Sequence, residues 1–554
     1  MLHAEVIRGS FQDSVTLMRV SGDLSAMPDV KRVAVMMGTP ANKDVYRETG
    51  LWHEALASAT PNDLCVVVDS DSADPTVAHT VATRVKQRLV EVARGHRGAA
   101  YPVVRSWRRA RQQLPDARIA LLSIAGHHAF GPARQALEDG CHVMLFSSNV
   151  SLEQELELKT IARRRALIVM GPDCGTAIVG GAPLAFANRI PSGPIAVVGA
   201  SGTGIQELTS QIARLGGGIT HALGLGGRDL SETIGGLSAL AALGLIARDP
   251  ASRVVAFVSK PPSPSVKSRV LAALQALGKP VVALFLGERP TRCTTGDVHL
   301  VRTLDAAAAL AVELAQADAR VAALPSVSGR AICGLFTGGT LASEAALLLA
   351  EALDLAPDAT HPAGHLLCAG GHRIVDLGDD AYTRGRPHPM IDPSPRHDWI
   401  LRLADDDEAG VLLLDVVLGY GAHPDPAGEV ARSVRELQVR RGDRPPILTI
   451  ATLTGTAQDP QDRDAQARKL AEAGVALAES VRAAILLALR AIAAPSPTSG
   501  EVPELLRTAP AVVNVGLRGF ADDLHANGVR VVHQQWEPVA GGDERLQRLL
   551  ARVR

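Results

Sequence analysis

Residues 195–203 read IAVVGASGT: an apolar run, a turn of small residues and the start of a helical pattern. Residues 332–340 repeat the arrangement as ICGLFTGGT. In each case a glutamate, Glu207 or Glu344, follows four residues after the threonine. A buried strand that leads through a glycine turn into a helix is the basic unit of a doubly wound α/β sheet. The sequence therefore predicts at least two such sheets.

The whole chain alternates apolar, strand-like runs with helical patterns. Its 554 residues are enough for three or four domains. The pattern predicts an α/β fold with several doubly wound domains. The expected divisions are a small α/β N-terminal domain at 1–105, a Rossmann-like domain at 106–190, doubly wound domains at 191–325 and 326–500, and a strand-helix-strand tail at 501–554. The tail either caps a sheet or docks a partner, and capping is the commoner role of such segments. The Ala/Leu-rich stretch 475–494 could likewise seat a partner, although burial within the chain is the commoner fate.

The composition excludes several classes of protein. Lys+Arg 57 against Asp+Glu 58 gives a net charge of -1, so no overall basic field attracts nucleic acid. With 3% aromatic residues, rows of base-stacking side chains are also excluded. No apolar run reaches the ~20 residues that span a bilayer, and the first residues do not form a secretory signal, so we expect a cytoplasmic protein. The scattered cysteines indicate reduced core residues.

The two glycine turns are candidate anion sites. A helix N-terminus after a glycine turn presents free N–H groups to a negative ligand. The candidate phosphate-binding residues are Ser201, Gly202 and Thr203 in the first turn and Gly338, Gly339 and Thr340 in the second. Neither turn has the lysine of a P-loop or the glycine order of a dinucleotide fingerprint. The alternative is that the hydroxyl residues only cap their helices. The repetition favours a phosphate held between the two helix starts.

The densest polar cluster is the segment GRPHPMIDP at 385–393. Its prolines stiffen the backbone around Arg386, His388 and Asp392. Arg386 offers a fork for a carboxylate or phosphate, and His388 can carry a proton near neutral pH. The alternative is a rigid surface loop whose charges pair with each other. No helical histidine spacing supports a metal site, so none is expected.

Three further positions are weaker candidates. Lys260 follows a buried strand, and Lys43 lies between a strand and a helix; each is a candidate site residue or a solvent-facing lysine. Asp173 is a turn residue and a candidate substrate-binding group. Its neighbour Cys174 lacks a base that would make it a nucleophile.

The order of these segments resembles the succinyl-CoA synthetase superfamily. GPDC at 171–174 is similar to a segment of the α subunit, ASGT at 200–203 to its phosphate-binding helix start, and TGGT at 337–340 to the helix start of the β subunit. The resemblance implies a CoA-binding-type Rossmann domain followed by two flavodoxin-like domains, with both helix starts facing one phosphoryl site. Residues 293–298 lack the superfamily's phosphate-carrying histidine, and no ATP-grasp domain is recognisable in the sequence. The chain is therefore expected not to phosphorylate substrates with a nucleotide, and CoA is possible but not favoured.

The chain also resembles the FdrA family along its whole length. The strings GSFQDSV at 9–15, MMGTPANK at 36–43, PLAFAN at 183–188, GGRDL at 226–230 and GRPHPMIDP at 385–393 carry that resemblance. The family is associated with the oxamate carbamoyltransferase of allantoin catabolism, in which FdrA acts with two other subunits.

The FdrA resemblance implies phosphorolysis of oxalurate, or a related ureido acid, to oxamate and carbamoyl phosphate in purine nitrogen catabolism. For such a reaction, the candidate catalytic residues are Arg386, His388, Asp392 and Lys260, and Asp173 and Asn188 are candidate substrate-binding residues. The alternatives are an acyl-CoA synthetase-like ligase or acyl transferase, and a non-catalytic scaffold subunit. Phosphorolysis needs phosphate, a hole for the carbonyl oxygen and a proton for the leaving nitrogen.

Overall fold

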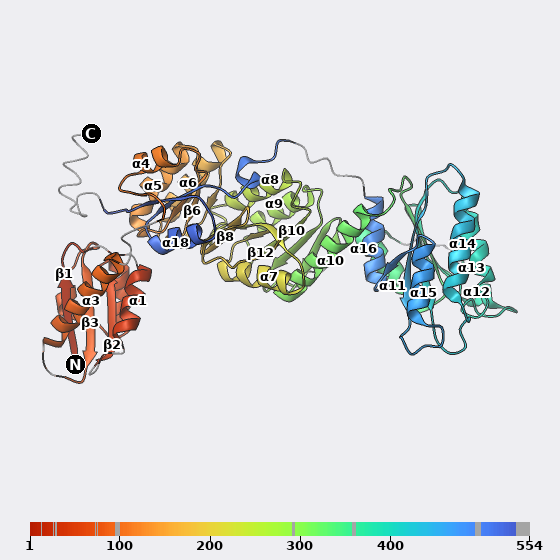
Figure 1. Ribbon diagram of the computed structural model, residues 1–554, viewed down its shortest axis with the longest axis horizontal. Helices are drawn as coiled ribbons and strands as arrows, with labels where there is room; N and C mark the ends of the chain where they lie inside the picture. The colour runs from red at the N-terminus through yellow and green to blue at the C-terminus, as the bar shows by residue number, and fades with distance from the viewer. Residues whose placement is uncertain are drawn as a thin grey trace.

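The computed structural model describes residues 1–10, 12, 14–25, 27, 30–72, 74, 76–94, 100–290, 294–356, 362–493 and 500–538. These residues form four β-sheets, each covered by helices. The domains follow one another in an elongated row, with the N-terminal domain at one end and residues 331–492 at the other (Figure 1). The predicted α/β fold with several doubly wound domains is confirmed.

The N-terminal domain has a small antiparallel sheet in the order β1-β3-β2. Side chains of the central strand β3 point alternately to the two faces of the sheet, and each face is covered by an apolar cluster. β3 is therefore buried on both faces. Leu64, Val66 and Val68 pack with α1 and α3, whereas Cys65 and Val67 pack on the side of Tyr46 in α2. The elements are β1 (Leu2–Ile7), α1 (Ser14–Leu24), β2 (Val30–Met37), α2 (Pro40–Glu48), the 3-10 helix η1 (Glu54–Leu56), β3 (Leu64–Ser70) and α3 (Thr76–Arg94).

The next sheet is parallel and has the order β4-β23-β22-β5-β6-β7. If β22 is counted as the first strand, this is the 3-2-1-4-5-6 order of the Rossmann fold. Its elements from the first part of the chain are β4 (Val103–Val104), α4 (Trp107–Gln113), β5 (Ile119–Leu122), α5 (Gly126–Glu138), β6 (His142–Leu145), α6 (Leu152–Arg164) and β7 (Val169–Met170). Those from the last part are α17 (Glu504–Arg507), β22 (Val512–Val515), α18 (Arg518–Ala526) and β23 (Val531–Gln534).

The tail is therefore not the separate cap or docking element expected from the sequence. β22 pairs with β5 along its whole length, from Val512 beside Ile119 to Val515 beside Leu122. All four β22 residues are buried, which an edge or cap strand would not require. The Rossmann-like domain thus contains both 106–170 and the described tail. Pairing between strands about 390 residues apart leaves no local signal in the sequence.

The third sheet has the order β14-β15-β13-β12-β10-β11-β8-β9. Its parallel strands follow the flavodoxin order 2-1-3-4-5 when β10 is counted as the first. The hairpin of β8 and β9 joins this sheet through β11, so the boundary expected at 190 lies before 176. The elements are β8 (Thr176–Val179), β9 (Ala182–Ala185), β10 (Ser192–Gly199), α7 (Gly202–Arg214), β11 (Ile219–Gly224), α8 (Leu237–Ala247), β12 (Val254–Ser259), α9 (Pro264–Gln275), β13 (Val281–Phe285), β14 (Thr294–Thr295), β15 (Val298–Val301) and α10 (Leu304–Ala322).

The fourth sheet has the order β17-β18-β16-β19-β20-β21. Counted from β16, its parallel strands again follow the flavodoxin order. The elements are β16 (Ala331–Phe336), α11 (Gly339–Leu353), β17 (His365–Ala369), β18 (His372–Asp376), α12 (Asp380–Thr383), α13 (Ser394–Leu401), the 3-10 helix η2 (Arg402–Asp405), β19 (Ala409–Val417), α14 (Pro426–Arg441), β20 (Leu448–Thr454), α15 (Arg463–Glu472), β21 (Ala476–Ala478) and α16 (Val481–Ile492).

Helix α16 lies between the two flavodoxin-like units, against α10 and α11. Its apolar residues Ala484, Ile485 and Leu487 are buried in the cluster that also contains Leu349 of α11. The Ala/Leu-rich stretch 475–494 is thus used inside the chain in its described part, rather than left as a docking surface. Among the described helices, none combines the length and apolarity needed to cross a bilayer.

Candidate functional site

The two glycine turns lie at equivalent places in the two flavodoxin-like sheets. α7 begins directly after β10, and α11 begins directly after β16. In each sheet the next strand in chain order lies on one side of that first strand and the third strand lies on the other. This is the topological switch point, where open α/β sheets bind ligands. The predicted helix starts are therefore placed where a ligand site is expected.

At the start of α7, Ser201 is the N-cap and its hydroxyl accepts the N–H of Gly204 at 3.2 Å. The N–H of Ala200 donates to the carbonyl of Val258, which holds the turn against β12. Thr203 is exposed, and Ser201 and Gly202 are half-buried. Ser201 therefore caps α7, and the N-terminus of this helix is still accessible to a ligand.

Two buried hydroxyl groups near this turn were not predicted from the sequence. Thr176 is only 1% exposed, and its Oγ1 has no hydrogen-bond partner among the described residues. A Cβ placed on Gly202 would lie 3.5 Å from that oxygen, so the hydroxyl lies beside the helix start. Ser259, the last residue of β12, is fully buried with an equally unpaired hydroxyl, and Lys260 after it is exposed. Unpaired buried donors need a ligand or water.

The start of α11 differs, because a carboxylate already occupies it. Asp415 of β19 is fully buried and accepts the N–H groups of Thr337 and Gly338, each at 2.8 Å. The Thr337 hydroxyl donates to the same carboxylate at 3.0 Å. Arg396 of α13 donates to Asp415 Oδ1 at 3.2 Å and to its carbonyl at 2.6 Å. A phosphate at this turn could reach only the amides further into the helix, at Gly339 and Thr340. A phosphate shared by both turns remains a prediction.

The segment 384–393 lies at the same edge of the fourth sheet. His388 is half-buried and its Nδ1 accepts the N–H of Met390 at 3.2 Å. Its Nε2 lies 2.7 Å from the position of a Cβ on Gly378, which follows β18. Arg386 is exposed. The segment is therefore attached to the site through His388, while Arg386 is left accessible to a ligand.

Asp392 has a local role in the structure. Its Oδ1 accepts the N–H of Ser394 at 3.1 Å, at the start of α13. Hydrogen bonds from the side chain and then the backbone N–H of Ser394 lower the pKa of Asp392. Helix α13 carries Arg396, so Asp392 supports the helix that positions the partner of Asp415. A catalytic role for Asp392 remains a prediction.

The remaining candidates are distributed over several elements: Asp173 and Cys174 lie in the turn after β7, Asn188 follows β9, and Lys43 belongs to α2. Asp173 is exposed with φ +58°, and Asn188 is exposed. Cys174 is buried, and burial raises the pKa of its thiol to about 12. Such a thiol stays protonated at neutral pH, so it does not provide a nucleophile. Lys43 donates to the carbonyls of Ala57 and Ala59 at 3.0 and 2.7 Å, which is a structural role.

The GGRDL string forms a buried ion cluster rather than a ligand site. Asp229 accepts the Lys159 ammonium at 2.7 Å and the first amides of α8, Ser238 and Ala239, at 3.0 and 2.9 Å. Lys159 and Arg228 both pair with Glu155. Because Lys159 and Glu155 belong to α6, this cluster attaches the Rossmann-like domain to the third sheet. It thereby fixes the GPDC turn relative to the start of α7.

Three family models match the chain, and together they define its class. An "AllF, heavy metal-associated domain" matches residues 1–102, a CoA binding domain matches 192–287 and a CoA-ligase domain matches 335–491. These are the parts of a succinyl-CoA synthetase-type chain with an additional N-terminal domain.

The chain belongs to the family of the uncharacterized protein YahF of Escherichia coli (strain K12), an FdrA/AllF-like family. The two are 36% identical over 501 residues, which is 85% of this chain and 95% of YahF. Among solved structures, PH0766 from Pyrococcus horikoshii OT3 matches with 14% identity and a TM-score of 0.37, over 69% of this chain and 86% of its own. A dinucleotide-forming acetyl-coenzyme A synthetase 1 of Ca. Korarchaeum cryptofilum matches with 16% identity and a TM-score of 0.39, over 69% and 84%.

The name of the N-terminal family model raises the question of a metal. In the described part of the chain, no three His, Cys, Asp or Glu side chains are grouped as ligands. Cys65 is fully buried in β3, and burial raises the pKa of its thiol to about 11. A thiol must lose its proton to bind a metal. The described residues of this domain therefore do not fit a metal centre.

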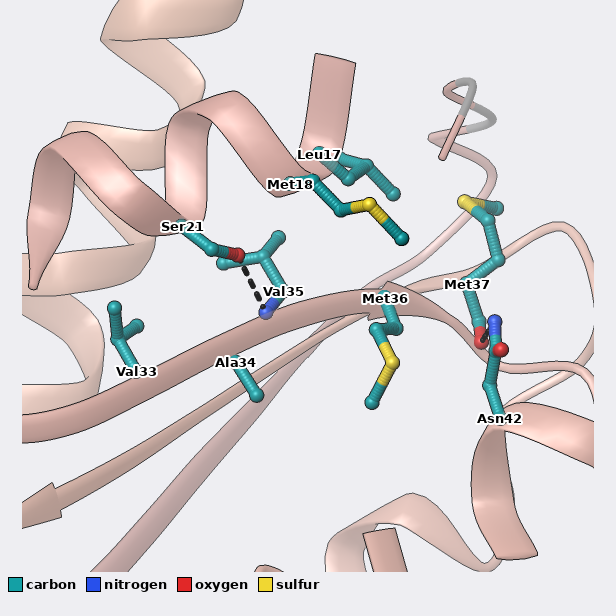
Figure 2. Close-up of a pocket in the computed structure, with 9 residues that line it drawn as sticks. All are labelled: Leu17, Met18, Ser21, Val33, Ala34, Val35, Met36, Met37 and Asn42. Carbon is teal, nitrogen blue, oxygen red and sulfur yellow. Dashed lines mark hydrogen bonds between the residues drawn. The ribbon is translucent and has the colours of Figure 1, made fainter. Parts of the chain in front are cut away.

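The N-terminal domain instead contains an apolar hollow of about 270 Å³ between α1 and β2 (Figure 2). Met18, Met36 and Met37 line it together with aliphatic side chains. Ser21 of α1 accepts the N–H of Val35 at 3.0 Å, which ties the helix to the edge strand (Figure 2). Its two polar lining residues, Ser21 and Asn42, are both hydrogen-bonded to the backbone of β2, so we place the candidate site in the later domains.

Proposed function

We propose that this chain is a subunit of a carbamoyltransferase that splits oxalurate, or a related ureido acid, with phosphate to give oxamate and carbamoyl phosphate. The observation that carries the proposal is the start of α7. There, the unpaired buried hydroxyl of Thr176 lies beside a helix N-terminus at a switch point. Ser259, whose buried hydroxyl is also unpaired, and the exposed Lys260 follow Val258, the residue that holds the turn on β12. This set of donors suits an oxyanion with several acceptor oxygens. The match to the AllF domain agrees with the allantoin pathway.

Each residue of the site would have one task in this reaction. The helix start and the two hydroxyls would orient hydrogen phosphate, and Lys260 would supply a positive charge. Arg386 would bind the carboxylate of the ureido acid through its fork. An oxygen of hydrogen phosphate then forms a bond to the carbamoyl carbon, and the bond from that carbon to the amide nitrogen breaks. The nitrogen leaves after it takes up a proton. Two further subunits complete the enzyme in this proposal.

The phosphate site predicts a specific kinetic defect. Thr176→Val removes an unpaired hydroxyl without changing the side-chain shape, and Lys260→Ala removes the nearby charge. Each change should raise the KM for phosphate about tenfold, because a lost hydrogen bond to a charged ligand costs about 1.5–3 kcal/mol. The KM would be measured with the full chain co-expressed with its genomic neighbours. Arg435→Ala, an exposed site on α14, is the matched control and should change nothing. An unchanged KM for phosphate in both variants would show that phosphate does not bind at the start of α7.

A CoA-dependent reaction is the second candidate, and two observations favour it. Family models for CoA-binding and CoA-ligase domains match the chain. The Rossmann-like sheet also has a switch point between β22 and β5, where Ser123 Oγ accepts the N–H of Leu517 at 2.7 Å. The melting temperature separates the candidates, because only a ligand that binds the folded chain raises it. Phosphate and carbamoyl phosphate should raise it for the first candidate, and CoA for the second.

A further inference from the structure

Phe186 is an exposed aromatic side chain beside the start of α7. Its backbone N–H donates to the carbonyl of Gly175 at 2.9 Å, and its own carbonyl accepts the side-chain amide of Gln206 in α7 at 2.5 Å. The Cα of Gly175 is 3.7 Å from the position of a Cβ on Gly202, the first residue of α7. The backbone of Phe186 is thus tied on both sides to the helix start where we place the phosphate, while its side chain is 51% exposed.

The ring of Phe186 is held on the side of the Rossmann-like domain. It meets Phe146, which follows β6, at 5.2 Å between ring centroids and 79°, and Phe520 of α18 at 5.7 Å and 82°. These are the edge-to-face contacts that aromatic rings prefer. Asp173 lies in the same region, because its N–H donates to the carbonyl of Ser147, the residue after Phe146. The exposed part of Phe186 therefore lies where the carboxyl edge of the Rossmann-like sheet meets the start of α7.

The backbone just before Phe186 has an unfavourable conformation. Ala185, the last residue of β9, has φ +56°, in the left-handed region that residues with a side chain rarely adopt. Ala185 pairs with Thr176 in the hairpin of β8 and β9, so the strained residue lies opposite the one with the unpaired hydroxyl. Backbone strain of this kind is concentrated at binding and active sites. The direction in which Phe186 leaves the hairpin is thus set by a conformation that alanine does not favour by itself.

The proposed reaction requires a flat group at this place. The carbamoyl carbon must come within about 3–3.5 Å of the attacking phosphate oxygen, so the ureido group must lie next to the start of α7. A ureido group is planar, because its nitrogen lone pairs are delocalised into the carbonyl as in a peptide bond. Its edges form hydrogen bonds, whereas its two faces are free to pack against an aromatic ring. Phe186 offers such a ring beside the phosphate.

We propose that the ring of Phe186 covers one face of the planar ureido group and thereby selects planar carbamoyl donors for this site. The inference rests on the phosphorolysis proposed above and adds a specificity-determining residue to it. Phe186 transfers no proton and forms no bond in the reaction. It restricts the ureido group to orientations in which phosphate meets the carbonyl carbon from the open face. Binding of phosphate itself depends on the helix start and the hydroxyl groups, and not on Phe186.

The test compares Phe186→Leu with Phe186→Tyr in the full chain co-expressed with its genomic neighbours. Leucine keeps an apolar contact with the neighbouring rings but lacks a flat face, whereas tyrosine keeps the ring. Phe186→Leu should raise the KM for oxalurate about tenfold, because stacking on an aromatic ring is lost, and leave the KM for phosphate within about twofold. Phe186→Tyr should keep both values within about twofold. Leu215→Ala is the matched control, since Leu215 is 49% exposed at the other end of α7, and it should change neither value.

The outcomes separate this inference from the function on which it rests. An unchanged KM for oxalurate in Phe186→Leu, or an equal rise in Phe186→Leu and Phe186→Tyr, would overturn the role of Phe186 while the phosphorolysis stands. A rise in the KM for phosphate as large as that for oxalurate would also overturn it, because the ring would then support the whole site rather than the ureido group. A wild-type complex that forms no carbamoyl phosphate from any ureido acid would overturn the proposed function and this inference together.

Discussion

A chain that ends at Thr508 should not yield soluble folded protein. The deletion removes β22, which lies in the middle of the Rossmann-like sheet with Val512, Val513 and Val515 at most 1% exposed. It also removes Phe520 and Leu524 of α18 from the same core. Each buried side chain contributes about 1.5–3 kcal/mol, so the loss from these residues alone is as large as the roughly 5–15 kcal/mol by which a domain is stable. Soluble yield and circular dichroism measure the outcome.

The matched control for this deletion ends at Pro538, which keeps every described strand. It should match the full chain in yield and in melting temperature. If the chain that ends at Thr508 were soluble and unfolded cooperatively, β22 and β23 would be dispensable. The central place of the tail in the sheet would then be contradicted.

The second large effect concerns Asp415. Asp415→Asn leaves the guanidinium of Arg396 buried without its counter-charge, since Arg396 is only 3% exposed. Breaking a buried ion pair from one side costs about 3–5 kcal/mol. Hydrogen exchange should therefore become faster in β16 and β19, whose turn and helix start depend on this carboxylate. The measurement resolves these strands separately from the other domains.

Asp398→Asn is the control for this substitution because Asp398 is exposed on the same helix as Arg396. Exchange in β16 and β19 should be unaffected by it. Equal exchange in Asp415→Asn and the control would show that the buried pair does not stabilise the α11 turn. The conclusion that Asp415 distinguishes the start of α11 from that of α7 would then be contradicted.

Most of the fold could be predicted from local patterns. Apolar runs such as 195–198 and 331–336 between helical segments specify buried parallel strands, and both became the first strands of flavodoxin-like sheets. The glycine turns likewise specified where α7 and α11 begin. The tail could not be placed in the same way. Its strand and helix patterns were recognised, but its partner strand β5 lies far away in the sequence.

The site was predicted less completely because its buried members have no characteristic spacing. Asp415 could be recognised from one feature of the sequence: it is a lone aspartate within the apolar run of β19, and a buried aspartate must be paired. Thr176 and Ser259 are ordinary strand residues in the sequence, and only their burial without partners indicates a ligand. The two glycine turns also have similar sequences, which do not indicate that the Asp415 carboxylate occupies the turn before α11.

The most direct test of the account is phosphorus NMR of the reaction of oxalurate with inorganic phosphate. The full chain would be assayed alone and after co-expression with its genomic neighbours, with ATP and CoA left out. The account predicts little or no product from the chain alone and a carbamoyl phosphate signal, with an equal amount of oxamate, from the complex. A purified chain that formed a CoA thioester with ATP and made no carbamoyl phosphate in the complex would contradict it.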